Sequence, residues 1–301
     1  GGPVTIADLT VQNGSTTGSG GGLYVASTLT LNNVRVLSNT ANNNAGGGIA
    51  IMSGALTLQN STVSGNSALG GGGISTYLGT LNVMSSTIAQ NNAPYLGGGI
   101  LADHSLLTVT NSTFISNSVS INAGSSMDNG GGICAGDSTI MVQSSTFSGN
   151  SADWGGGLYV YSSTATVKNS TFSDNPAIFG DGLAAQYGTV TVMNSTFSSN
   201  DTGNRGGIVS FPGTLFSLQN SIVATPNSSW DCVGTVVSQG YNIESGLNCG
   251  FTNGVNGDNQ LLVSGDSLNL QPLANNGANG DNPLLLTSSS LNLQPLANNG
   301  A

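Results

Sequence analysis

Two aspartates stand where a pair of carboxylates could act together. Asp128 and Asp153 each precede a glycine cluster by two residues, so alignment of the clusters puts both in one column of the sequence. If the segments that carry them lie side by side as parallel strands, their backbones are about 5 Å apart. That spacing suits the carboxylate pair of a retaining glycosidase, or the oxygen ligands of a Ca²⁺ site.

Catalysis on a polysaccharide would need more than this pair. It calls for clustered carboxylates with a basic side chain that stabilises developing charge, and neither a third acid nor a basic residue lies near the two aspartates in sequence. We interpret both as solvated turn residues, with a Ca²⁺ site as the weaker alternative. His104, the only histidine, follows Asp103 on a turn and has no serine or cysteine nucleophile in phase with it, which argues against a catalytic triad. We expect a protein that is not an enzyme and has no cofactor.

The cysteines point to a disulfide rather than to a metal site. Cys232 and Cys249 bracket a glycine-rich segment, Cys134 stands alone, and His104 is far away in sequence as a further ligand. A Cys232–Cys249 disulfide would place the protein in an oxidising compartment. We therefore expect it outside the cell or on the cell surface.

Composition excludes whole classes of function. Ser, Thr, Asn and Gly make up just over half of the 301 residues, and the net charge of −10 comes from thirteen thinly spread acids against three basic residues. A nucleic-acid-binding protein needs clustered Lys and Arg to neutralise phosphates, so that class is excluded. No apolar run approaches the ~20 residues of a membrane span.

The elements that must position these side chains come from a repeat. A glycine cluster followed by an aliphatic residue recurs at intervals of 26, 25, 26, 33, 25, 25 and 25 residues. Its aliphatic members are Leu23, Ile49, Ile74, Ile100, Ile133, Leu158, Leu183 and Ile208. The interval of 33 contains a longer loop at 118–129. Repeats of this length are typical of solenoids, whose successive units stack on one another.

Each unit contains three short stretches of alternating residues separated by Gly, Ser, Asn and Asp. Such alternation indicates strands and the separators are turn residues. We therefore predict an all-β protein, a right-handed parallel β-helix of about 8–9 coils with three short strands per coil. Stacking puts like residues in contact, which predicts two columns. One is a core stack of Phe114, Phe147, Phe172 and Phe197, and the other is a side-chain amide ladder at a turn, made by Asn39, Asn66, Asn91, Asn117, Asn150, Asn175 and Asn200.

The paired motifs also resemble a known family. GGG followed by Ile or Leu, alternating with FxxN (114–117, 147–150, 172–175 and 197–200), is similar to the repeat of polymorphic outer-membrane proteins and of other bacterial right-handed β-helix surface proteins. The likeness covers about 20–230. Segments NSIVA, DCVG and CGF within 220–251 resemble the C-terminal region of secreted bacterial β-helix proteins. The resemblance implies secretion and a surface or adhesive role.

The domain organisation follows from the repeat. Residues 1–230 form the β-helix, 231–256 a C-terminal coil or cap with the disulfide, and 257–301 a tail in which LNLQPLANNGA occurs twice. The tail is expected either to cap the last coil or to contact a neighbouring subunit. Because the open ends of a β-helix expose unpaired backbone groups, we expect end-to-end self-assembly into a filament or surface layer.

Two alternatives remain for function, and one for modification. The protein could be an adhesin that binds glycans or a host surface through 118–129, or a polysaccharide lyase or glycoside hydrolase with the β-helix fold. Asn-x-Ser/Thr sequons make it a candidate glycoprotein, although the repeat itself requires most of these residues at turns. The sequons start at Asn13, Asn60, Asn111, Asn169, Asn194, Asn200 and Asn227.

Overall fold

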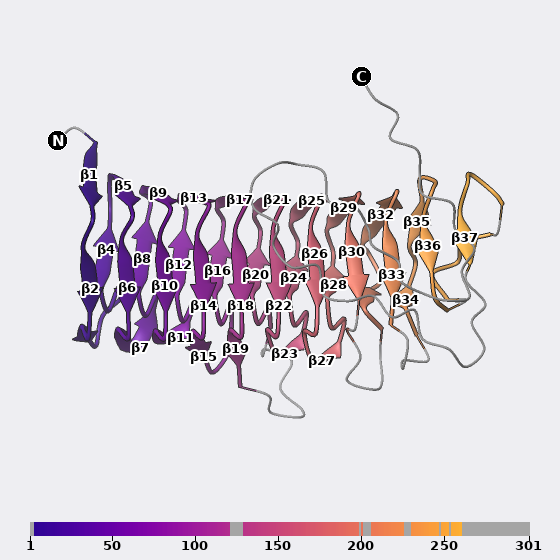
Figure 1. Cartoon of the computed structure of the whole chain (residues 1–301). Helices are drawn as coiled ribbons and strands as arrows, with labels where there is room; N and C mark the ends of the chain where they lie inside the picture. Colours follow the sequence, from indigo (N-terminus) through magenta and orange to yellow (C-terminus); the bar gives the residue numbers. More distant parts are fainter. Residues whose placement is uncertain are drawn as a thin grey trace, which may run out of the picture.

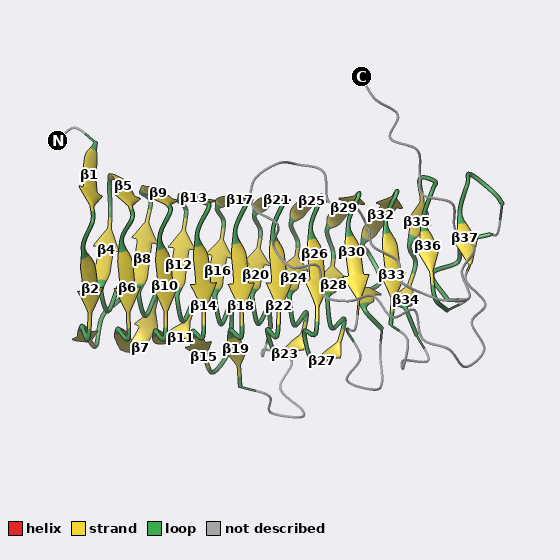
Figure 2. Cartoon of the chain, viewed as in Figure 1, coloured by secondary structure: helices red, strands yellow, loops and turns green. Residues whose placement is uncertain are grey.

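The computed structural model describes residues 3–120, 129–198, 200, 206–225, 230–246, 248–252 and 254–260. Together these residues form thirty-seven strands and no helix. The strands lie side by side along one long axis, from β1 at one end to β37 at the other (Figure 1). Short turns connect successive strands through most of the stack (Figure 2). The described chain is a parallel β-helix, as predicted.

Three long sheets run the length of the stack, and every pairing in them is parallel. Sheet A has ten strands: β1 (Val4–Ala7), β5 (Thr28–Asn32), β9 (Ala55–Gln59), β13 (Thr80–Met84), β17 (Leu106–Thr110), β21 (Thr139–Gln143), β25 (Thr164–Lys168), β29 (Thr189–Met193), β32 (Leu215–Gln219) and β35 (Val237–Ser238). Sheet D has nine: β4 (Leu23–Val25), β8 (Ile49–Met52), β12 (Ile74–Tyr77), β16 (Ile100–Asp103), β20 (Ile133–Gly136), β24 (Leu158–Tyr161), β28 (Leu183–Gln186), β31 (Ile208–Ser210) and β34 (Cys232–Gly234).

Sheet B is the third long sheet. Its eleven strands are β2 (Thr10–Gln12), β6 (Arg35–Leu37), β10 (Thr62–Ser64), β14 (Thr87–Ala89), β18 (Thr113–Ile115), β22 (Thr146–Ser148), β26 (Thr171–Ser173), β30 (Thr196–Ser198), β33 (Ile222–Ala224), β36 (Ile243–Glu244) and β37 (Asn259–Gln260). One coil therefore runs through sheet D, then A, then B, before the glycine cluster starts the next strand of sheet D.

A fourth, shorter sheet was not predicted. Sheet C follows sheet B in the coil and consists of β3 (Ser15–Thr16), β7 (Thr40–Ala45), β11 (Ser67–Gly70), β15 (Asn92–Ala93) and β19 (Ser118–Val119), with a separate pair β23 (Ala152–Trp154) and β27 (Ala177–Phe179). Three strands per coil is thus an underestimate for most of the rod. These segments are only two to six residues long, and they lack the alternation by which the other strands can be found.

The corners explain why turn residues recur in phase. In the coil that starts at β12, the corners begin at Leu78, Ser85 and Gln90, whose φ angles are +51°, +48° and +55°. At each corner one residue adopts the left-handed backbone conformation, which turns the chain into the next strand. Asparagine, aspartate and glycine adopt this conformation most easily. The coil geometry therefore favours Asn, Asp, Ser and Gly between strands, although Leu78 and Gln90 show that other residues also adopt this conformation.

The glycine clusters form the remaining corner, where coils are closest. Gly71 has a φ of +59°. A Cβ on the next residue, Gly72, would lie 2.3 Å from the backbone oxygen of Asn92, in β15 at the end of the same coil. Because a real Cβ cannot approach that closely, this corner needs glycine both for its positive φ and for its lack of a Cβ.

The core fills the space between sheets A, B and D. Inward positions such as Ile74, Leu81, Val83 and Ile88 have no exposed surface, and the same positions are buried coil after coil. The ladders also continue beyond residue 230, because β34 to β37 extend sheets D, A and B. Of the tail at 257–301, residues 261–301 lie outside the described part of the chain.

Candidate functional site

The phenylalanine column lies at the centre of the rod, as the phase predicts. Phe114, Phe147, Phe172 and Phe197 are fully buried on successive strands of sheet B. Neighbouring ring centroids are 4.6, 4.6 and 4.8 Å apart, and the rings are within 8° of parallel. The column therefore provides packing and leaves no ring free for a ligand.

The asparagine column forms a continuous amide ladder at the corner after sheet B. Each Nδ2 donates to the Oδ1 of the asparagine in the following coil, over 2.9–3.2 Å, from Asn39 through to Asn200. Most also donate to a backbone carbonyl of the preceding coil, as Asn117 does to Ile88. All seven side chains are at most 1% exposed. The ladder satisfies buried backbone groups that would otherwise be costly.

A second polar column was missed in the sequence. Buried serines at the corner between sheets A and B form a ladder in which each backbone N–H donates to the hydroxyl of the next coil's serine. Each hydroxyl in turn donates to the carbonyl two residues before it, as Ser86 does to Met84. The members are Ser61, Ser86, Ser112, Ser145, Ser170, Ser195 and Ser221. These serines occupy the same position in every repeat, and that recurrence is the sequence signal that could have revealed the ladder.

The sequons divide into accessible and inaccessible asparagines. Those that begin the Asn-Ser-Thr motifs are exposed and adopt positive φ, as Asn60 (+51°) and Asn111 (+49°) do. Their serines belong to the buried ladder just described. Asn200 is fully buried and its Nδ2 donates to Phe172 O, so it cannot carry a glycan in the folded protein. Asn227 lies outside the described residues.

Only one member of the aspartate pair, Asp153, lies in the part of the chain that the structure describes. Asp153 is 1% exposed within β23, so the expectation of a solvated turn aspartate is wrong for this residue. It is buried because sheet C, absent from the sequence-based prediction, adds a strand there. Asp128, and with it most of the 118–129 loop proposed for adhesion, lies outside the described residues.

Beside β23, aromatic side chains pack on the outer face of sheet D. Trp154 stacks on Phe211 with ring centroids 4.5 Å apart, and Phe179 lies 5.3 Å from Trp154. Cys134 and Tyr159 are buried in the same cluster. Burial raises the pKa of the Cys134 thiol to about 12, with a smaller contribution from Asp103. Cys134 is therefore protonated at neutral pH and is neither a thiolate ligand nor a nucleophile.

A cluster of three titratable groups lies at the corner between sheets D and A. Asp103, His104 and Asp137 each present a ligand atom within 4.8 Å of the other two. His104 Nδ1 is 2.7 Å from Asp103 Oδ1, and the Tyr77 ring lies edge-on at 6.0 Å. In the sequence, Asp103 and His104 were interpreted only as neighbours on a turn outside any catalytic triad, and Asp137 was not considered. The register places His104 and Asp137 at the same corner of successive coils. The sequence carries a signal for this, because the two residues are separated by the same 33 residues as Ile100 and Ile133 of the repeat.

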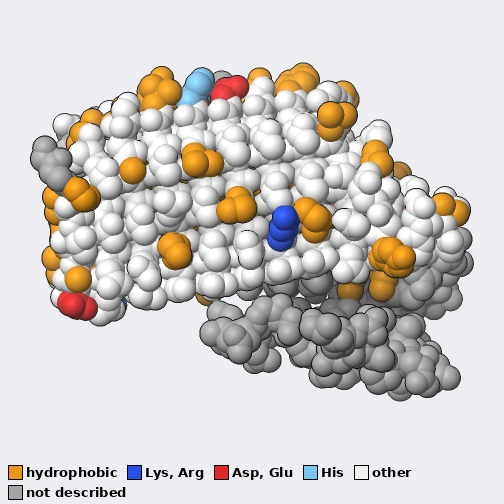
Figure 3. Space-filling model, turned by 90° about the horizontal axis from the view of Figure 1, so that it is seen from above, with side chains coloured by type: hydrophobic (Ala, Val, Ile, Leu, Met, Phe, Trp, Pro, Cys, Tyr) orange, Lys and Arg blue, Asp and Glu red, His pale blue; other side chains and the backbone are white. Residues whose placement is uncertain are grey.

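The outer face of sheet A is almost free of charge. Figure 3 shows this face as mainly uncharged polar side chains and backbone with scattered hydrophobic residues, and a histidine beside an acidic side chain at its edge. Among the strands of sheet A, Lys168 at the end of β25 is the only basic residue. Such a face has few positive charges that could attract phosphates.

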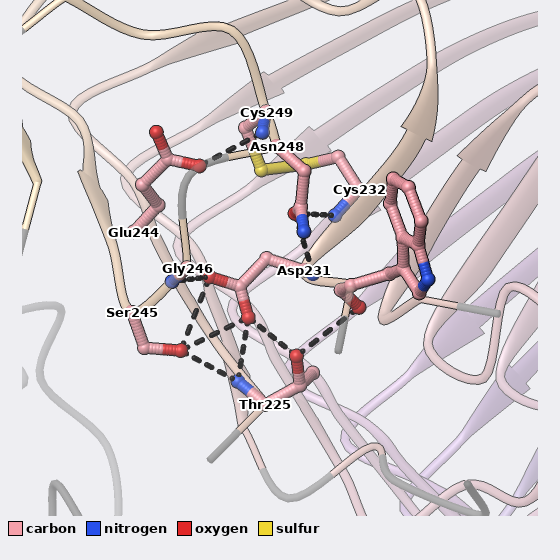
Figure 4. The surroundings of a disulfide bond; sticks show 9 residues. Thr225, Asp231, Cys232, Glu244, Ser245, Gly246, Asn248 and Cys249 are labelled. Atoms are coloured by element: carbon pink, nitrogen blue, oxygen red, sulfur yellow. Dashed lines mark hydrogen bonds between the residues drawn. A yellow bond between two sulfur atoms is a disulfide. The ribbon is translucent and has the colours of Figure 1, made fainter. Parts of the chain in front are cut away.

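The disulfide predicted from the sequence is present in the last coils. Cys232 and Cys249 are joined with their Cα atoms 4.7 Å apart, and both are buried (Figure 4). Asn248 Oδ1 accepts hydrogen bonds from the backbone N–H of Asp231 and of Cys232, at 2.7 and 3.1 Å. The crosslink thus ties β34 to the segment after β36.

Buried carboxylates surround this disulfide. Asp231 accepts hydrogen bonds from the Thr225 N–H (3.0 Å), the Thr225 hydroxyl and the Ser245 hydroxyl (2.9 Å), and Glu244 accepts one from the Cys249 N–H (2.8 Å) (Figure 4). Glu244 is fully buried in line with Val223 and the phenylalanine column. These acids organise the polar backbone of the last coils.

Removing the disulfide should destabilise this end selectively. The paired substitution of Cys232 and Cys249 by alanine is expected to lower the free energy of unfolding of the last coils by about 3 kcal/mol, since the 17-residue separation closes a loop in the unfolded chain. Hydrogen exchange should show faster exchange in β34 and β36 and unchanged exchange in β9 and β13. As a control, reductant should not alter the double variant further. Equal protection of β34 in both proteins would contradict the prediction.

No helix in the described residues is long and apolar enough to cross a membrane.

Among curated proteins no match was found, and no solved structure matches either. The family described as a right-handed β-helix region matches residues 4–129. Together with the stacked parallel coils, this match identifies the fold as a right-handed parallel β-helix, the architecture of a β-helix repeat protein.

Proposed function

We propose that this chain is a secreted structural rod of the cell exterior that assembles end to end with further copies. The GGGI/FxxN repeats resemble those of polymorphic outer-membrane proteins, which supports a surface location. The buried disulfide supports an oxidising compartment. Continuous ladders and stacked side chains make such a rod stiff, because each coil is held along its whole perimeter by the next.

The observation behind the proposed assembly is that the first described coil exposes inward apolar side chains. Val4 and Ile6 of β1 occupy the same inward columns as Leu29 and Leu31 of β5. Val4 is 51% exposed and Ile6 is partly exposed, whereas Leu31 is fully buried. One more coil stacked on β1 would bury these side chains as completely as those of the second coil.

The backbone at this end is equally ready to pair. Within the described residues, β1, β2, β3 and β4 are the terminal strands of their sheets, each paired on one side only. Edges of this kind pair with other strands unless they are protected. Because all four lie in one coil, a single docking event would continue every sheet at once.

Sedimentation of the 301-residue chain across a wide concentration range, with electron microscopy of the same samples, tests the proposal. We expect the weight-average mass to rise with concentration and filaments to appear. Replacing Ile6 with lysine should abolish both, because it puts a charge on the open end. The matched control is Thr110→Lys, which adds the same charge to the side of sheet A, where Lys168 already stands in the same column.

Two outcomes would reject end-to-end assembly. One is a monomer at every concentration, seen as isolated rods. The other is assembly of the Ile6→Lys variant as efficient as that of the wild type, which would place the interface elsewhere. Antibody labelling of intact source cells tests the exterior location separately.

A further inference from the structure

The corner between sheets D and A carries a cluster of titratable side chains, Asp103, His104 and Asp137, that has no evident part in holding the coils together. In the coils from β8 to β28 this corner contributes one non-glycine residue with positive φ, and outside the candidate site it is uncharged: Ser53, Leu78, Ser162 and Tyr187. Only two successive coils depart from this pattern, with His104 and Asp137. Both have φ angles near those of their neighbours (+47° and +46°), so the change is in chemistry and not in backbone shape.

The departure concentrates negative charge that neither Arg35 nor Lys168, the basic residues in the described part of the chain, balances. Asp103 and Asp137 bring two carboxylates to within 4.8 Å of each other's ligand atoms and of the His104 imidazole. The only ion pair found among the described residues is that between His104 and Asp103. Lys168 and Arg35 lie on other elements, in β25 and β6. Like charges held this close together are unfavourable without a counter-ion.

We propose that Asp103, His104 and Asp137 bind Zn²⁺. One imidazole nitrogen and two carboxylate oxygens are ligands that this ion takes at about 2.0–2.2 Å, with water completing the shell. The His104 and Asp103 side chains are 51% and 42% exposed, so they can turn inward to close the remaining gap. The histidine selects Zn²⁺ over Ca²⁺, which prefers oxygen ligands alone.

The ladder preorganises this site. The His104 N–H donates to Gly136 O and the Asp137 N–H to Tyr161 O, so the two corners are fixed one above the other. The bound ion would join the coils on the two sides of the longest interval of the repeat, the 33 residues from Ile100 to Ile133.

The chain offers an unusually direct readout, because His104 is its only histidine. The imidazole resonances of the untagged, full-length protein therefore report this site alone. On titration with Zn²⁺ we expect these resonances to shift and saturate with the same midpoint as calorimetry gives, at one ion per chain. Ca²⁺ at the same concentrations should leave them in place.

Variants separate the site from general acidity. His104→Asn and Asp137→Asn keep a residue that tolerates positive φ, and each should weaken Zn²⁺ binding at least about tenfold. The matched control is Asp174→Asn, another exposed corner aspartate (φ +54°), which should bind as the wild type does. Thermal unfolding of the metal-free variants checks that the fold is kept.

The proposal is overturned if His104→Asn binds Zn²⁺ as tightly as the wild type. Imidazole resonances that stay unchanged when calorimetry shows saturation would overturn it too, as would Ca²⁺ competing equally well. Loss of binding in Asp174→Asn as large as in Asp137→Asn would mean diffuse attraction by the net negative charge and would equally reject a defined site.

Discussion

Replacing Asn117 with alanine is expected to lower the free energy of unfolding by about 3–5 kcal/mol. The Asn117 amide accepts from the Nδ2 and backbone N–H of Asn91, and it donates to Ile88 O and Asn150 Oδ1. Alanine would leave these groups buried without partners, in the middle of a ladder where water cannot replace them. Equilibrium unfolding in urea, analysed by linear extrapolation, measures the loss.

The repeat supplies a matched control for this variant. Asn111 is exposed at a corner with positive φ, and the same corner is occupied by Ser85 and Ser144 in neighbouring coils. Asn111→Ser should therefore change stability by less than about 0.5 kcal/mol. If Asn117→Ala cost no more than Asn111→Ser, the ladder would contribute nothing to stability beyond the turn it occupies.

Replacing Phe147 with alanine should have a similarly large effect, about 3–5 kcal/mol. Its ring is fully buried and stacks on Phe114 and Phe172, both at 4.6 Å. Alanine would open a cavity that the rigid ladders on either side cannot close by relaxing. Phe147→Leu, which fills most of the volume, should cost clearly less, and the difference between the two variants reports the cavity.

A neighbouring residue provides the comparison. Ile115 follows Phe114 in β18, is 40% exposed, and stands level with Ser148 in the next coil. Ile115→Ser should thus be nearly neutral in the same urea experiment. A loss below about 1 kcal/mol for Phe147→Ala would show that the stack is not part of the cooperative core.

The recurrence of one residue type at one position of the repeat was enough to predict the buried columns of the interior. Phe114 to Phe197 and Asn39 to Asn200 recur at one position of each coil, and in a stacked solenoid equal position means contact. Sheet C could not be found in this way. Strands such as Asn92–Ala93 are too short to show alternation, and they are fixed by the coils on either side rather than by their own side chains.

The candidate site was harder to predict than the core. His104 and Asp137 meet only because the chain returns to register after its longest interval, and alignment on the glycine clusters drew attention to Asp128 and Asp153 instead. The burial of Asp153 depends on β23, an element with no sequence signature. The serine ladder was hidden for another reason, since Asn-Ser-Thr is typical of turns and its serine can be recognised as interior only once the coil is known.

The amide ladder runs in one direction only. From Asn39 to Asn175, each Nδ2 donates to the Oδ1 of the next asparagine toward the C-terminus, and none of these side-chain bonds runs the other way. Two rods that met through identical ends would oppose like groups, so only a head-to-tail joint continues the pattern. Such heterologous joints do not close on themselves, and they build open polymers rather than dimers. A filament of this protein would consequently be polar, with two chemically different tips that lengthen at different rates.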